Sequence, residues 1–144
     1  MFNAFEYFST IYTAAGLAKI FKASGISMVE DYLKSFSSTH DNCLIVRDSG
    51  DGSLNFKDRQ LDTSYHTIYI FEKGKLNDPA ANMAAKRAAM LKGIALFKLM
   101  KKDAEEFGQS AYGFDDSKVD YAEIGPIGQQ FYGYSFAFLM EHSF

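Results

Sequence analysis

A long predicted helix, residues 79–107, limits the folds open to this chain. Asn77-Asp78-Pro79 is a strong helix start, because Asp78 can cap the first turn and a proline fits the first helical position. Gly108 supplies a left-handed stop. At 1.5 Å per residue the helix is about 43 Å long. This is long for a chain of 144 residues, so we expect one end of the helix to project or bend.

A stripe of large apolar side chains is expected to bury this helix against the rest of the chain. The stripe consists of Met83, Met90, Leu91, Ile94, Phe97, Met100, Ala104 and Phe107. The helix also carries six cations and three anions, a local charge of +3, and since the whole chain has a net charge of −3 the remainder carries −6. A solvated basic face is the favoured interpretation, and contact with nucleic acid or an acidic protein is the alternative.

Two strand pairs are predicted, one on each side of the long helix. Residues 43–46 are a short apolar run, and residues 64–72 alternate β-branched and aromatic side chains. We expect these runs to pair as a hairpin, although the polar loop 47–63 between them is long. Such a loop is functional or mobile, and in an assembly protein it is a candidate contact arm. The second hairpin is predicted from strands at 119–124 and 130–141 with a turn at 125–128.

Two helices are predicted before the first hairpin. Asn3 can cap a helix that runs to about Lys22, and Ser27 can cap a shorter one that ends near Phe36. The polar stretch 35–42 is predicted as a loop. The fold class is therefore α+β: N-terminal helices, a β-hairpin, a long central helix and a second β-hairpin (αββαββ), with the helices packed on a mainly antiparallel sheet. Residues 1–144 are expected to form a single α+β domain.

The last strand has two different faces. One carries Tyr132, Tyr134, Phe136, Phe138 and Met140, and the other carries Phe131, Gly133, Ser135, Ala137 and Leu139. The second face is predicted to contact the long helix, because its small residues permit close approach.

Composition excludes several functional classes. The mild net charge gives no strong attraction to nucleic acid or membranes, and we expect neither sequence-specific nucleic-acid binding nor membrane association. No apolar run reaches the roughly 18 residues of a membrane span, and the N-terminus lacks the basic region of a signal peptide, so a cytoplasmic location is expected. The 14 Phe and 9 Tyr indicate either a tightly packed aromatic core or a partner surface.

No catalytic, cofactor-binding or metal-ligating residue is predicted, and no cofactor is expected. His40, His66 and His142 show no metal-ligand spacing, and His66 is predicted to be a strand surface residue. Cys43 is predicted to be a buried, inert thiol. Residues 48–53 are predicted to be a turn and not a calcium loop, because two of the first three ligand positions fall on glycines.

The order of these elements resembles that of tail-terminator or tail-completion proteins of long-tailed bacteriophages and prophages. The residues that carry the resemblance are Cys43-Leu44-Ile45-Val46 with the aspartate-containing loop after it, Tyr65-His66-Thr67-Ile68-Tyr69-Ile70-Phe71, Asn77-Asp78-Pro79, and the closing segment Tyr121 to Phe136. The resemblance implies a structural virion protein, without catalysis or cofactor, assembled in the host bacterial cytoplasm. It also implies a homo-oligomeric ring that joins head and tail and meets other neck and tail-tube proteins.

Three functions remain open from the sequence. The first is this tail terminator, or another neck or connector protein. The second is a small α+β module that binds a ligand or a peptide in a pocket between the helix and a curved sheet. The third is an enzyme of an unfamiliar kind, for which the sequence nominates no residues.

Overall fold

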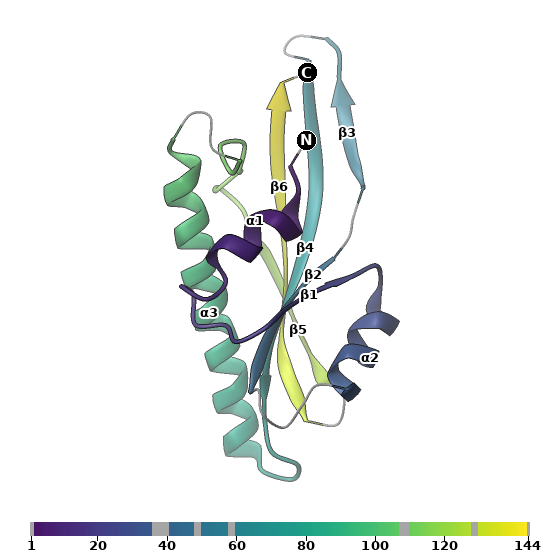
Figure 1. The fold of residues 1–144 in the computed structure, drawn as a ribbon, viewed down its shortest axis with the longest axis vertical. Coiled ribbons are helices and arrows are strands. Elements are labelled where there is room, and N and C mark those ends of the chain that lie inside the picture. Colours follow the sequence, from purple (N-terminus) through teal and green to yellow (C-terminus); the bar gives the residue numbers. More distant parts are fainter. Residues whose placement is uncertain are drawn as a thin grey trace.

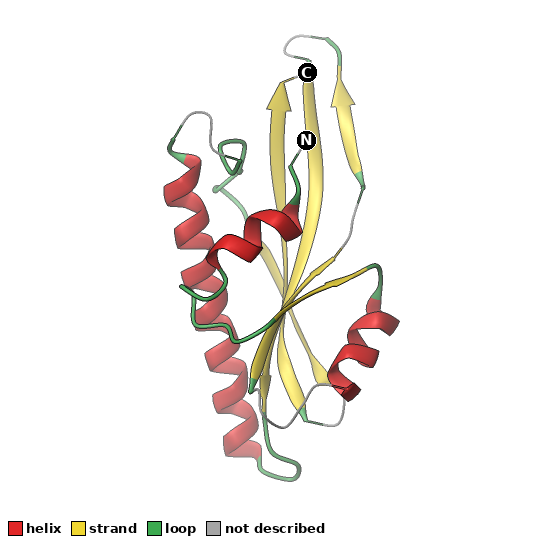
Figure 2. Ribbon diagram, in the orientation of Figure 1, coloured by secondary structure: helices red, strands yellow, loops and turns green. Residues whose placement is uncertain are grey.

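The computed structural model describes residues 2–35, 41–47, 50–57, 60–106, 110–127 and 130–143. Within these ranges the chain is α+β, with three helices and a six-stranded, mostly antiparallel sheet (Figure 1, Figure 2). The helices are α1 (Ala4–Ile11), α2 (Ile26–Ser35) and α3 (Pro79–Ala104). The strands are β1 (Ile20–Ala23), β2 (Asn42–Arg47), β3 (Gly52–Asn55), β4 (Leu61–Lys73), β5 (Asp120–Ile127) and β6 (Phe131–Ser143).

Two strands of 13 residues each, β4 and β6, form the centre of the sheet. They pair antiparallel over their whole lengths, from Leu61 opposite Ser143 to Lys73 opposite Phe131. The strand order is β1-β2-β4-β6-β5, and β3 pairs with β4 beyond the end of β2. The predicted pairing of 43–46 with 64–72 is therefore confirmed, as is the C-terminal hairpin.

The helices lie on both faces of this sheet, and each face has its own core. On one face α1 and α3 cover Ile68, Ile70, Phe136 and Phe138. On the other face α2 covers a smaller cluster that includes Phe71. Figure 1 shows α1 and α3 on one side of the strands and α2 on the other. The expected aromatic core is present, because Phe8, Phe97 and Phe114 each make a ring contact with Phe138.

The N-terminal segment differs from the prediction of one helix that runs to Lys22. Asn3 does cap α1, since its Oδ1 accepts from the Glu6 N–H at 3.0 Å. The helix nevertheless ends at Ile11, and Gly16 then adopts φ = +92°, which a helix does not contain and glycine tolerates. The chain then forms β1, which pairs parallel to β2 with Ile20 opposite Leu44.

The predicted loop 47–63 contains a strand. Residues 52–55 form β3, which pairs antiparallel with the first residues of β4, from Gly52 opposite Ser64 to Asn55 opposite Leu61. Polar composition concealed this strand, because all four of its residues are exposed and leave no alternating apolar pattern. Residues 48–49 and 58–59 of the predicted loop lie outside the described residues, as does most of the predicted loop 35–42.

The start of the long helix is as predicted, but its buried face is only partly so. Asp78 Oδ1 accepts from the Ala81 N–H at 3.0 Å and Pro79 follows at the first position. The residues buried against the sheet are mainly small: Ala85, Ala89, Gly93, Leu96 and Met100. Of the predicted stripe, Met100 is buried, and Met90, Phe97 and Ala104 are partly buried against the core, as predicted. Met83, Leu91 and Ile94 are exposed, and Phe107 and the predicted stop Gly108 lie outside the described residues.

The face of β6 that contacts α3 is also opposite to the prediction. Phe136 and Phe138 belong to the core that contains Leu96 and Met100 of α3, and a Cβ on Gly93 would lie 2.3 Å from the Phe136 ring. Phe131, from the other face, packs in the cluster under α2. The aromatic side chains of the strand occupy the space, so the helix contributes the small residues that permit close approach.

Candidate interaction surface

The outward side of α3 carries large apolar side chains that nothing in the described chain covers fully. Met83 is 68% exposed and Leu91 60% exposed, and Ile94 is exposed as well. Leu91 follows Met83 after eight residues, about two helical turns, and Ile94 follows Leu91 after three, so the three side chains share one side of the helix. Arg87 lies within the same stripe and is exposed. This combination of apolar and basic side chains is typical of a surface that a partner covers.

A groove separates this side of α3 from the neighbouring strands. It encloses about 410 Å³ and is lined by α3 residues together with Glu123 of β5 and Tyr134 of β6; the α3 residues are Met83, Lys86, Arg87, Met90 and Leu91. Lys86 forms an ion pair with Glu123 across the groove. Tyr121, which is exposed, stacks edge-on against Tyr134 with ring centroids 5.8 Å apart. The groove therefore has an apolar floor, a tyrosine edge and a basic rim.

A second exposed apolar surface lies on the three-stranded arm, which we define as β3 with the paired halves of β4 and β6. Leu54 of β3 is 59% exposed, and Phe56 just after it is exposed as well. Leu54 lies opposite Asp62 of β4, so both side chains are on the same face of the arm. Figure 1 shows the arm extending at one end of the molecule beyond the helices.

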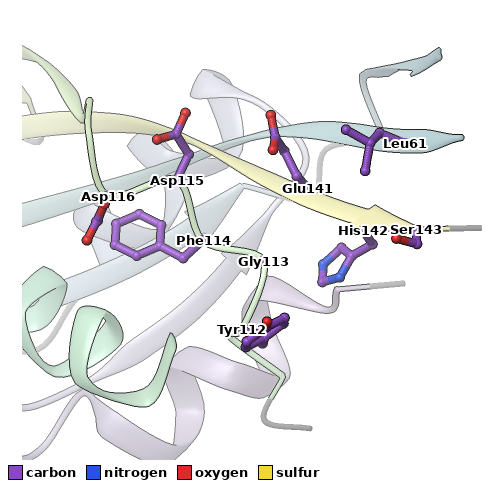
Figure 3. A pocket seen from close by; sticks show the side chains of 9 residues that line it. All are labelled: Leu61, Tyr112, Gly113, Phe114, Asp115, Asp116, Glu141, His142 and Ser143. Atoms are coloured by element: carbon purple, nitrogen blue, oxygen red, sulfur yellow. The ribbon is translucent and has the colours of Figure 1, made fainter. Parts of the chain in front are cut away.

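An open hollow of about 750 Å³ lies beside the arm, where the segment 112–116 lies alongside the end of β6 (Figure 3). The Gly113 carbonyl accepts from the Glu141 N–H, and the Asp115 N–H donates to the Leu139 carbonyl, so this segment borders β6 as a strand would. Carboxylates of Asp115, Asp116 and Glu141 give the hollow an acidic lining. Small-molecule pockets are mostly apolar, so this lining is not that of a typical ligand pocket.

Two histidines lie close to this end of the core. His66 is buried, which corrects its prediction as a surface residue: its ring lies between Phe2 and Phe138, and Nε2 is 2.7 Å from Ser64 Oγ. Burial lowers the pKa of His66, and the nearby His142 lowers it further. His66 Nδ1 and His142 Nε2 are buried atoms without a hydrogen-bond partner in the described chain. His40 lies outside the described residues.

Three other side chains with titratable groups are buried, those of Glu72, Tyr7 and Cys43. Lys92 of α3 forms an ion pair with the buried Glu72 of β4; burial raises the pKa of Glu72, and Lys92 acts against that rise. Tyr7 Oη donates to Asp103 Oδ2 at 2.7 Å, which joins α1 to α3. Cys43 is fully buried, and burial raises the pKa of its thiol to about 12, as expected of the inert thiol predicted from the sequence.

Within the described ranges, no three His, Cys, Asp or Glu residues lie close enough to hold a metal ion together. The helices in those ranges are also too short or too polar to cross a membrane.

Comparison with known proteins adds no family to this description. No protein-family model matches the sequence, and no curated protein matches it.

The key residues of the surface are ones that the sequence predicts to lie in the core. Met83, Leu91 and Ile94 were predicted to be buried because they are large and recur at helical spacing. The competing signal was the set Ala85, Ala89 and Gly93, which recurs every four residues on the opposite side of the helix. A row of small residues facing a strand that carries Tyr134, Phe136 and Phe138 was the observation that could have identified the buried side.

Proposed function

We propose that this chain is a structural virion protein of a tailed bacteriophage or prophage, a tail terminator or neck component that assembles as a homo-oligomeric ring between head and tail. The observation that carries the assembly role is the apolar and basic stripe of α3, in which Met83 and Leu91 are each more than half exposed. The position between head and tail comes from the resemblance in element order.

The energetics support an assembled state. Covering a large aliphatic side chain is worth about 1.5–3 kcal/mol, so Met83, Leu91 and Ile94 together offer several kcal/mol to a partner. The long helix and the groove beside it provide an extended surface for such a partner. A ring also requires a second, different surface on the same chain, since head-to-tail contacts join unlike surfaces. The arm with Leu54 meets that requirement.

The test is the oligomeric state of the purified full chain. We expect light scattering to give a mass several times the 16.2 kDa of one chain, and negative-stain images to show closed rings, alone or on the ends of purified tail tubes. A chain that stays monomeric at high concentration, and that neither forms rings nor binds tail tubes or neck proteins, would contradict the proposal.

The alternative is a small ligand- or peptide-binding module, for which the hollow beside the arm is the relevant observation. That function predicts saturable binding of a small molecule or peptide to the monomer, with chemical-shift changes in Tyr112, Glu141 and His142. The acidic and open lining makes this the less favoured candidate.

A further inference from the structure

We infer that the arm of one copy of this chain occupies the groove between α3 and β5 of the next copy. Leu54 would then lie against Leu91, and Asp62 would lie against Arg87. This inference rests on the proposed function and identifies the contact that builds the assembly.

The arm and the groove are complementary surfaces. Both present exposed apolar side chains, Leu54 on the arm and Leu91 on α3. Their charges are opposite. The arm carries Asp62 directly beside Leu54, whereas α3 carries Arg87 one turn before Leu91. A specific interface usually has a desolvated apolar contact at its centre and complementary charges at its rim.

The arm and the groove also lie on opposite sides of the central strand pair. The arm strand β3 pairs with one edge of β4, whereas β5 pairs with the far edge of β6. Because β4 and β6 are paired along their full lengths between them, a single chain cannot place its own arm in its own groove. The contact must join different copies, and it joins unlike surfaces, so repetition gives a closed ring or an open filament.

The free edge of β5, which borders the groove, offers a poorer contact than the groove itself. The edge strand β5 contains Pro126, which has no N–H to donate, and its pairing is irregular between Ile124 and Ile127. Its exposed Asp120 and Glu123 add charge. These features oppose addition of another strand, so side-chain packing in the groove is favoured over continuation of the sheet.

Cysteine cross-linking tests the contact directly in the full chain. Two single variants, Leu54→Cys and Leu91→Cys, carry tags of different size and are mixed under mild oxidation; the native Cys43 is buried and does not interfere. We expect the mixed disulfide to form several-fold faster than with Ser9→Cys in place of Leu91→Cys, because Ser9 is exposed on α1 away from the groove. Equal rates for both pairs would overturn the inference.

A charge exchange gives an independent measurement. Arg87→Glu should shift the assembly toward monomer, and the double variant Arg87→Glu with Asp62→Arg should recover it. Circular dichroism checks that each variant is folded. If the wild-type chain forms rings and Leu54→Glu forms them equally well, the arm contact is refuted while the ring assembly stands. If the wild-type chain remains monomeric under all conditions, both fail.

Discussion

Replacement of Gly93 by alanine tests how closely α3 lies on β6. A Cβ at this position would lie 2.3 Å from Cζ of Phe136 and within 2.9 Å of both Cε atoms. The Phe136 ring is itself buried and packs against the rings of Phe97 and Tyr134. The added methyl group must therefore displace a ring that is held on several sides, which makes a simple rotation of that side chain insufficient.

Two opposing effects set the magnitude. Forcing an extra carbon into a packed core costs about 1–3 kcal/mol, whereas alanine is favoured over glycine inside a helix by about 1 kcal/mol. We expect a net loss of about 1 kcal/mol in the free energy of unfolding, which corresponds to a fall in Tm of about 2–4 °C for a chain of this size. The exposed control Ala84→Gly reports the helix-propensity effect alone and should cost about 1 kcal/mol.

The assay is urea unfolding followed by circular dichroism for the wild type, Gly93→Ala, Phe136→Leu and the double variant. With the ring replaced by leucine, Gly93→Ala should become neutral or stabilising by up to about 1 kcal/mol, so the cycle should give a coupling of about 1–2 kcal/mol between the two sites. A gain of about 1 kcal/mol from Gly93→Ala in both backgrounds would refute the close packing of α3 on Phe136.

Three further predictions concern the buried groups. Burial lowers the pKa of folded His66 below its ordinary value of 6.5. On acidification this histidine is therefore protonated first in the unfolded chain. The free energy of unfolding then falls as the pH drops below 6.5, by up to about 1.4 kcal/mol per pH unit. His66→Phe should flatten this dependence in urea titrations between pH 8 and pH 5, and an unchanged slope would contradict it. Tyr7→Phe removes the hydrogen bond to Asp103 and should cost about 1–2 kcal/mol, with no further loss when Asp103→Asn is added. Gly133→Ala would place a Cβ 1.8 Å from the Ile70 carbonyl oxygen and should cost about 3 kcal/mol or more, whereas Gly50→Ala, with nothing within 4 Å, should be tolerated; equal effects of the two would argue against the close pairing of β4 and β6.

Local signals predicted the order of most elements. Asn3 and Asp78 cap helices through hydrogen bonds to residues three positions later, and such caps depend on neighbours in sequence. The alternation of residues 64–72 likewise located β4. The prediction of a single helix to Lys22 was wrong. Gly16 has a positive φ, and residues 20–23 pair with β2 as a parallel strand, so the helix does not continue through them. Pairing with a strand more than 20 residues away gives no signal within Ile20–Ala23 itself.

The sequence predicted the fold better than it predicted the candidate surface. The composition pointed to excess aromatic side chains, and the structure places most of those it describes in or against the two core clusters. The exposed residues on which the candidate surfaces mainly rest, Leu54, Met83 and Leu91, carry no motif. Their importance follows from exposure, and exposure depends on which side of α3 meets the sheet.

The sequence by itself determined that this chain is α+β, with a long capped helix between two strand pairs, because capping, helical spacing and strand alternation are properties of neighbouring residues. Only the tertiary structure decided which side of α3 is buried. One side of α3 carries Met83, Leu91 and Ile94, and the other carries a row of small residues together with Leu96 and Met100. Such a helix can pack either way, and the choice depends on the volume of the facing side chains. Phe136 fills that volume and selects the side that carries Gly93. The same contact leaves Met83 and Leu91 on the outside, where the proposed partner would cover them.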